Sequence, residues 1–342
     1  MDILARALKM VGIDTMYGLV GIPVTEFSNI AQSRGIRFVG FRHEQQADMA
    51  AATHGFLTGK PAVLLTVSSL GFLNGLTATT NATVNCYPMI QISGSSVREP
   101  IDLDQGTYEG LDQLNAAKPF VKAAYRVNKP EDIPTAVVRA YRAAVSGRPG
   151  GVYLDVTTPC LGAIMNATDA DKLFYEPVDL CPAAPPAPEA VKRAGALIAS
   201  AKKPAILIGK GAAYARVEDQ LKKLVETTGI PYFPMSMAIG VLPDDGRLSA
   251  LACRSTIMEE ADVVVLVGAR LNWLLSRGHG KWSADTKFVQ LDIEPTEIDC
   301  NRPIAAPVVG DLNSSLNALL AELPQYKMSM DPAWVPSLQA QT

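Results

Sequence analysis

Short apolar segments alternate with helical segments along most of this chain, and this alternation constrains its fold more than any other feature. Strands are expected at 36–41, 62–67, 89–92 and 152–156, which are mostly apolar, with helices at 44–57 and 72–83 between them. Apolar strands that are joined by helices pair in parallel and are covered on both faces. The sequence therefore predicts an α/β fold with a doubly wound parallel sheet.

The alternation is interrupted once and then resumes, which indicates two domains. The pattern fades after residue 157, and four prolines fall within 182–188, as in a stiff linker. Beyond it a second doubly wound sheet is expected, with strands at 204–208, 230–234, 262–267 and 287–292. A chain of 342 residues is long enough for two such domains. We expect a first domain at 1–157, a linker at 158–188, a second, Rossmann-like domain at 189–325 and a tail or further linker at 326–342.

Charge and hydropathy argue against two classes of partner. The net charge is −3 and the pI is near 5.7, so a basic face for nucleic acid is not expected. The longest unbroken apolar run, 263–267, is far shorter than the roughly 20 residues that span a bilayer. The five cysteines include no CxxC pair, which predicts reduced thiols and no metal site. These observations predict a cytoplasmic protein that binds neither nucleic acid nor membranes.

Glu44 is the strongest candidate for a functional carboxylate. It opens the helix predicted at 44–57, directly after the strand at 36–41, and open α/β sheets bind their ligands at the carboxyl ends of strands. The neighbouring Ala47, Met49 and Ala50 would favour the uncharged form of a carboxyl group. A glutamate in the first turn can also serve only to complement the helix dipole. From this stretch alone, that simpler explanation is favoured.

The second domain carries a weak nucleotide-binding pattern. Residues 206–214 form a strand, a Gly-x-Gly turn and a helix start, which can offer backbone N–H groups to a phosphate. Tyr214 stands at the third glycine position, so a dinucleotide fingerprint fails and an NAD enzyme is disfavoured. Asp292 ends a strand and could accept a hydrogen bond from a ribose. Arg254 and Arg270 could grip phosphates, although an ordinary surface role explains each of them equally well.

Several motifs, in the same order, resemble those of thiamine-diphosphate-dependent decarboxylases, and most of all the oxalyl-CoA decarboxylase family. They lie at 21–25 (GIPVT), 42–45 (RHEQ), 71–77 (GFLNGLT), 108–113 (YEGLDQ) and 209–214 (GKGAAY), with further likeness at 267–273 and 291–295. The resemblance covers nearly the whole chain. It implies a pyrimidine-binding domain followed by a central domain. The family's third domain, which holds the diphosphate and Mg²⁺, is expected to be absent from this chain, which alone would then be inactive.

The resemblance also implies a chemistry for named residues. Glu44 matches the carboxylate that activates the aminopyrimidine ring of thiamine diphosphate, and Asn74 matches a cofactor-binding position. Ile22 matches a residue whose backbone lies against the reacting centre, and Tyr108 and Glu109 match a pair that lines that centre. The implied activity is that of a lyase in oxalate catabolism, which converts oxalyl-CoA to formyl-CoA and carbon dioxide.

The resemblance further implies a homodimer or homotetramer and an ADP site in the central domain. Lys210, Asp292 and Arg148 are the residues that it suggests for ADP, which would act as an activator. Two alternatives stay open: a 2-hydroxyacyl-CoA lyase, whose motifs are very similar, and a non-catalytic nucleotide-binding or regulatory fragment. Asp48 departs from the family pattern. As a second acid one turn after Glu44, it could repel the charge of Glu44 or disrupt an apolar pocket.

Overall fold

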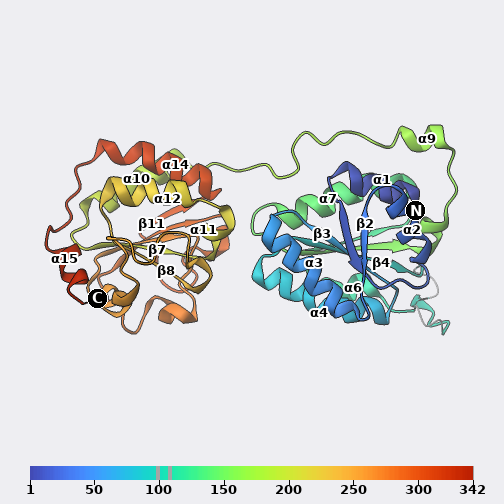
Figure 1. The fold of residues 1–342 in the computed structure, drawn as a ribbon, viewed down its shortest axis with the longest axis horizontal. Helices are drawn as coiled ribbons and strands as arrows, with labels where there is room; N and C mark the ends of the chain where they lie inside the picture. The colour runs from blue at the N-terminus through green and yellow to red at the C-terminus, as the bar shows by residue number, and fades with distance from the viewer. Residues whose placement is uncertain (98–100, 107–109, 342) are drawn as a thin grey trace. The chain divides into compact units, whose positions relative to one another are not determined.

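The computed structural model describes residues 1–97, 101–106 and 110–341 and divides into two compact units, Met1–Pro182 and Ala183–Thr342. Each unit contains one parallel β-sheet with helices on both of its faces (Figure 1). The two doubly wound sheets that the sequence predicts are therefore confirmed. No helix in these described ranges is both long and apolar enough to cross a bilayer.

The sheet of unit 1 has six parallel strands in the order β2-β1-β3-β4-β6-β5. Their bounds are β1 Thr15–Gly18, β2 Arg37–Gly40, β3 Ala62–Thr66, β4 Met89–Ser95, β5 Ala123–Val127 and β6 Gly151–Thr157. Every residue of β3, β4 and β6 is buried, as expected for strands covered on both faces. Because all strands are parallel, their carboxyl ends lie along one edge of the sheet.

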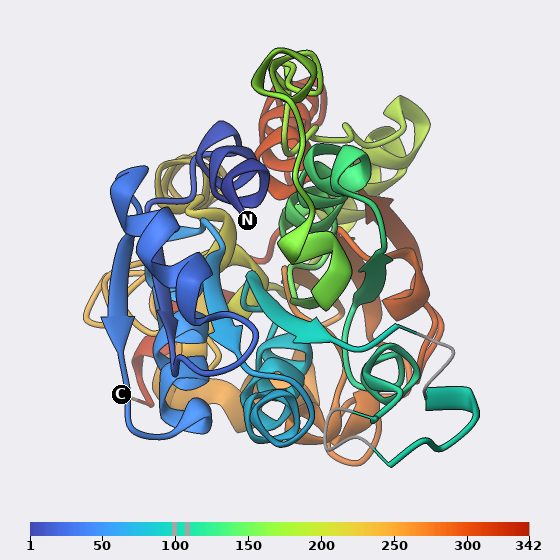
Figure 2. The ribbon, with the colours of Figure 1, turned by 90° about the vertical axis from the view of Figure 1, so that its right-hand side faces the viewer.

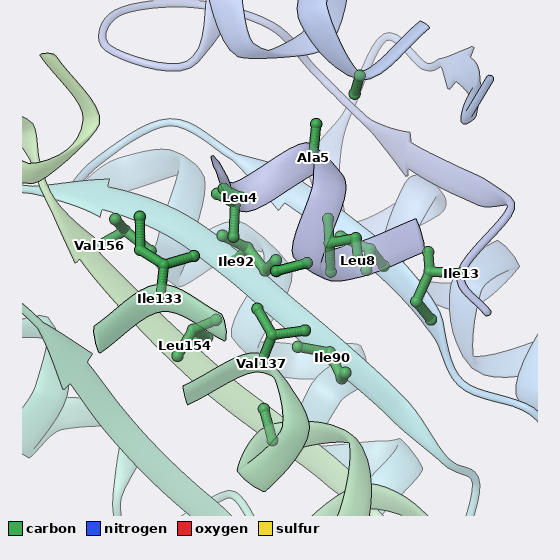
Figure 3. Packing of buried hydrophobic residues seen from close by; sticks show 14 of the residues in the cluster. Leu4, Ala5, Leu8, Ile13, Ile90, Ile92, Ile133, Val137, Leu154 and Val156 are labelled. Carbon is green, nitrogen blue, oxygen red and sulfur yellow. The ribbon is translucent and has the colours of Figure 1, made fainter. Parts of the chain in front are cut away.

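Helices cover both faces of this sheet. They are α1 Asp2–Met10, α2 Thr25–Ser33, α3 Glu44–Thr58, α4 Leu70–Asn85, α6 Gln113–Ala117, α7 Ile133–Val145, α8 Thr158–Gly162 and α9 Ala167–Asp171. Helices α1 and α7 pack together on one face, and α3 and α4 pack together on the other (Figure 2). Figure 3 shows Leu4 and Leu8 of α1 and Val137 of α7 against Ile90 and Ile92 of β4. This apolar layer fixes the sheet that carries the site.

Unit 2 has five parallel strands in the order β11-β10-β9-β7-β8. They are β7 Pro204–Ile208, β8 Tyr232–Pro234, β9 Val263–Val267, β10 Lys287–Asp292 and β11 Ala306–Val309. One face is covered by α10 Pro188–Ser200, α11 Lys210–Ala215, α12 Glu218–Thr228 and α14 Leu312–Glu322. The other face packs against α13 Arg254–Glu260 and α15 Trp334–Gln339. The two faces form separate apolar clusters.

The structure divides the predicted linker and places the predicted tail in a core. Residues 158–182 belong to unit 1, where Leu161 and Ala170 are part of the buried core and Asp171 pairs with Arg6 at 2.7 Å. The tail at 326–342 belongs to unit 2, where Trp334 is 2% exposed and its Nε1 donates to the carbonyl of Pro204 at 2.9 Å. Isolated apolar residues and one ion pair make these contacts, so hydrophobic periodicity does not reveal them.

Candidate active site

Three neighbouring strands of unit 1 end beside one another, and the segments that follow them meet around Val67. A Cβ atom added to Gly21, after β1, would lie 2.6 Å from Val67 Cγ1. One added to Gly71, after β3, would lie 2.4 Å from Val67 Cγ2 and 3.1 Å from Glu44 Oε1, which follows β2. Only glycine fits at these two positions without displacing a neighbour. The close approach brings the β1–α2 turn, the start of α3 and the start of α4 together.

Glu44 lies at the centre of this arrangement. It is the first residue of α3, where the Nδ1 atom of His43 caps the helix by accepting from the Gln45 N–H at 3.2 Å. The residue is only 5% exposed. Asn74 Nδ2, on α4, donates a hydrogen bond to Glu44 Oε2 at 3.1 Å. Oε1 has no hydrogen-bond partner within the described part of the chain. One carboxyl oxygen is therefore held by the protein, and the other remains available to a ligand.

Ile22 lies in the turn beside Gly21 and is 70% exposed. The peptide bond between Ile22 and Pro23 is cis. Leu70 and Leu73, in the first turn of α4, are also exposed large apolar side chains. The segments that surround the buried Glu44 carboxyl thus present apolar surface to the outside.

A buried hydrogen-bond network fixes the loop between β3 and α4. Ser69 has the backbone angles φ 56° and ψ −101°, and its N–H donates to Gln113 Oε1. Gln113 Nε2 donates to the carbonyl of Gly94 at 3.0 Å and to the Tyr153 hydroxyl at 2.8 Å, while Ser68 Oγ donates to the same carbonyl at 2.9 Å. Burial raises the pKa of Tyr153 well above its ordinary value, so its hydroxyl keeps its proton. Gln113 therefore anchors the loop that leads to Asn74.

Sequence reasoning did not assign Gln113 a role, and the available signal was its place at the end of the 108–113 motif. Tyr108 and Glu109 of the same motif lie outside the described residues. Their place beside the reacting centre stays a prediction. Gln113 opens α6 a few residues later and is completely buried, so the end of this segment is fixed to the loop before α4.

Asp48 is completely buried one turn after Glu44 on α3. Its carboxyl oxygens lie 3.2 and 3.3 Å from Thr79 Oγ1 on α4. Burial raises the pKa of Asp48 well above its ordinary value, and hydrogen bonds from Thr79 and Ala78 oppose this rise only in part. The raised pKa favours the uncharged form of Asp48, and that form does not repel Glu44 electrostatically.

In unit 2, Lys210 and Asp292 lie at the same edge of the sheet. Lys210 opens α11 after β7, and Asp292 ends β10. Asp292 Oδ1 accepts from the Glu294 N–H at 3.0 Å. The Gly-x-Gly turn also has a structural cause, because a Cβ on Gly209 would come within 2.3 Å of the Gly268 carbonyl oxygen. Packing alone is enough to require that glycine.

The three candidate arginines have protein partners. Arg270 forms an ion pair with Glu297 at 2.6 Å and lines a small pocket with Asn272, Gln290 and Arg302. Arg254 donates to the carbonyl of Leu274. Arg148 belongs to unit 1, where its Nη2 lies 3.4 Å from Cys86 Sγ. Across the described ranges, no group of three or more His, Cys, Asp or Glu side chains is placed to hold a metal ion.

Comparison with known protein families gives two matches. The description "Thiamine pyrophosphate enzyme, N-terminal TPP binding domain" matches residues 1–116, and "Thiamine pyrophosphate enzyme, central domain" matches residues 191–319. The first match contains Glu44, Ile22 and Asn74. The second contains Lys210 and Asp292.

Individual proteins give a consistent result. Oxalyl-CoA decarboxylase of Escherichia coli (strain K12) is 56% identical over 334 residues, which is 98% of this chain and 59% of that protein. The 2-hydroxyacyl-CoA lyase of Arabidopsis thaliana is 42% identical over 343 residues, again 98% of this chain and 59% of that protein. The chain thus spans about three fifths of the length of these relatives.

Among solved structures, benzoylformate decarboxylase from Polynucleobacter necessarius matches with a TM-score of 0.82. The match covers 97% of this chain and 62% of that one. At 20% sequence identity, this likeness concerns the fold alone.

Proposed function

The chain belongs to the thiamine pyrophosphate enzymes, and on that premise we propose that it supplies the cofactor-activating part of an oxalyl-CoA decarboxylase. Such an enzyme converts oxalyl-CoA to formyl-CoA and carbon dioxide. The proposal rests on Glu44. Its carboxyl group is buried at the carboxyl ends of the strands, and one of its oxygens has no hydrogen-bond partner in the described part of the chain. The identity of 56% to an oxalyl-CoA decarboxylase, against 42% to a 2-hydroxyacyl-CoA lyase, supports this substrate over the alternative.

The residues around Glu44 fit the aminopyrimidine ring of thiamine diphosphate. Oε1 can share a proton with a ring nitrogen, while Asn74 fixes the orientation of the carboxyl through Oε2. The exposed Ile22 and Leu73 offer apolar surface against which a ring can exclude water. The bound cofactor would supply the electron sink for the decarboxylation. Glu44 would hold and return the proton that activates it, and general acid–base assistance of this kind contributes roughly 10²–10⁴ in rate.

We propose that the diphosphate group and Mg²⁺ are held by a further domain of the full-length protein. We also propose that the active unit is a homodimer or homotetramer, as the resemblance implies. Tyr108 and Glu109 are proposed to line the reacting centre beside Glu44. Arg148, Arg254 and Arg270 remain candidates for contacts with the phosphates of CoA or of a nucleotide.

The test is a product assay on the full-length protein with thiamine diphosphate and Mg²⁺. With oxalyl-CoA as substrate, we expect formyl-CoA and carbon dioxide as products. Liquid chromatography and mass spectrometry of the CoA thioesters detect the conversion. The control is a 2-hydroxyacyl-CoA, from which a lyase would release an aldehyde. Faster cleavage of the 2-hydroxyacyl-CoA than of oxalyl-CoA would contradict the decarboxylase proposal and favour the lyase. No cleavage of either thioester would favour the third possibility, a regulatory subunit.

We further propose that ADP binds at the edge of unit 2 where Lys210 and Asp292 lie. Isothermal titration of the protein with ADP is expected to release heat, and Lys210→Ala is expected to weaken binding about tenfold or more, since a hydrogen bond to a charged group contributes roughly 1.5–3 kcal/mol. Lys281→Ala is the matched control, because Lys281 is exposed in the segment before the amino end of β10. Absence of heat with the unmodified protein, or equal affinity of the two lysine variants, would contradict this site.

A further inference from the structure

Asp48 joins three elements of unit 1 through one hydroxyl group. The Thr79 Oγ1 atom lies 3.2 and 3.3 Å from the two oxygens of Asp48, 2.8 Å from Gln91 Oε1 and 3.3 Å from the carbonyl oxygen of Gly75. Asp48 is on α3, Thr79 and Gly75 are on α4, and Gln91 is on β4. Asp48, Thr79 and Gln91 are each 0% exposed, so water cannot supply missing hydrogen bonds from bulk solvent.

If Asp48 is charged, this network has more acceptor atoms than the one hydroxyl proton of Thr79 can serve. Gln91 Nε2 donates to the carbonyl of Phe72 at 2.9 Å, which turns Gln91 Oε1 toward Thr79 as an acceptor. The Thr79 hydroxyl has one proton, and its shortest contact is with Gln91 Oε1. If that proton is donated to Gln91, an Asp48 oxygen can bond to Thr79 Oγ1 only by donating a proton of its own.

A protonated Asp48 would supply the donor that the Thr79 hydroxyl lacks once its own proton goes to Gln91. Asp48 donates to Thr79, Thr79 donates to Gln91, and Gln91 donates to the carbonyl of Phe72, in the first turn of α4. The start of α4 also carries Asn74, which donates to the Glu44 carboxyl, and Gly71, where an added Cβ would lie 3.1 Å from Glu44 Oε1. The chain of hydrogen bonds therefore begins one turn after Glu44 on α3 and ends beside its partners on α4.

The surroundings of Asp48 contain few groups that titrate. Glu44 is the nearest ionisable residue on α3, and Tyr17 of β1 is engaged with His54 Nδ1 at 3.2 Å. The groups that α4 and β4 contribute to the network do not ionise: Gly75, Thr79 and Gln91. Among the described residues, no cation forms an ion pair with Asp48, and burial of an unpaired charge is costly. This agrees with the raised pKa of Asp48, whose main cause is burial.

We propose that Asp48 is a positioning residue that works as a neutral acid, fixing α3 against α4 and thereby holding Glu44 in register with Asn74. The positioning role rests on the proposed function of Glu44. The protonation state of Asp48 does not, because it follows from the hydrogen-bond network of the folded protein alone.

The first experiment measures stability against pH, by calorimetry, for the unmodified protein and Asp48→Asn. An acid whose pKa is raised by folding stabilises the protein at low pH and loses that contribution as pH rises through the folded-state pKa. The asparagine side chain of the variant cannot lose a proton. The ratio of the folding equilibrium constant of Asp48→Asn to that of the unmodified protein should therefore grow about tenfold per pH unit from pH ~4 up to the folded-state pKa. Asp14→Asn, at an exposed position in the same unit, should show no such growth. A constant difference between Asp48→Asn and the unmodified protein would overturn the neutral acid.

The second experiment measures turnover by the full-length holoenzyme. Asp48→Ala is expected to lower kcat several-fold with a smaller change in KM, because the buried Asp48 side chain does not contact the substrate. Asp48→Asn should restore most of that loss, since its Nδ2 can donate to Thr79 as the protonated acid does. An Asp48→Asn variant that is folded yet as slow as Asp48→Ala would overturn the positioning role. If the proposed function itself is wrong, Glu44→Gln also keeps its activity, whereas the pH dependence of stability is unaffected.

Discussion

Glu44→Gln in the full-length holoenzyme is expected to lower turnover by about 10²–10⁴-fold, the usual contribution of a positioned acid–base group. Glutamine has nearly the same shape and can still meet Asn74, but its side chain cannot take up or release a proton. Glu44 is 5% exposed, and its Oε1 has no hydrogen-bond partner within the described residues, so the oxygen that would carry the proton is not held by the protein. The rate of product formation from oxalyl-CoA measures the effect, and the midpoint of thermal unfolding checks that the fold is kept.

Glu26→Gln is the matched control. Glu26 is also a glutamate in the first turn of a helix, α2 of the same unit, but it is exposed. If Glu44 served only to complement a helix dipole, both variants would lose a similar, small amount of stability and neither would lose turnover. Wild-type turnover by Glu44→Gln would remove Glu44 from the mechanism.

Arg126→Met is expected to lower the free energy of unfolding of unit 1 by about 3–5 kcal/mol, the usual cost of leaving one member of a buried ion pair without its partner. Arg126 Nε lies 2.7 Å from Asp155 Oδ2, and the two side chains are 9% and 0% exposed. They face each other across β5 and β6. Burial raises the pKa of Asp155, and Arg126 opposes this rise. The loss should therefore be largest at high pH and smaller where Asp155 can take up a proton.

Two further variants make this prediction specific. Arg34→Met removes an exposed ion pair with Asp2, whose side chains are 49% and 43% exposed, and should cost no more than about 1 kcal/mol. Arg126→Met combined with Asp155→Asn removes both charges of the buried Arg126–Asp155 pair and should recover much of the loss. All three tryptophans, at 273, 282 and 334, lie in unit 2, so hydrogen exchange of the β5 and β6 amides is the suitable measurement for unit 1. Equal losses in the free energy of unfolding for Arg126→Met and Arg34→Met would contradict the prediction.

The strands that the sequence predicts best are those that their own residues are enough to identify. β9 is an uninterrupted apolar run, β3 is apolar up to its last residue, Thr66, and all residues of both strands are buried in the structure. β5 and β11 were not predicted. β5 is only partly buried and contains Arg126, whose partner lies 29 residues away, and β11 contains a proline. Their pairing is decided by neighbours in space, which a local pattern does not show.

The candidate site divides in the same way. The position of Glu44 at the carboxyl end of a strand follows from the order of strand and helix. Its contact with Asn74 joins residues 30 positions apart and was not predicted, because the motif resemblance implied only that Asn74 is a cofactor-binding position. The bond between Gln113 and Ser69 spans 44 positions, and the one between Asp48 and Thr79 spans 31. These contacts depend on how helices pack on the completed sheet. Sequence periodicity therefore predicts the scaffold more fully than the polar network within it.

The backbone of Ser69 has a consequence for protein engineering. Its φ of 56° and ψ of −101° lie where glycine fits without steric cost and other residues are strained, typically by about 1–3 kcal/mol. Ser69→Gly would relieve this strain and raise thermal robustness, but it would also widen the range of shapes open to the loop before Asn74. At this position, selection for heat resistance and selection for catalytic speed are expected to favour different residues.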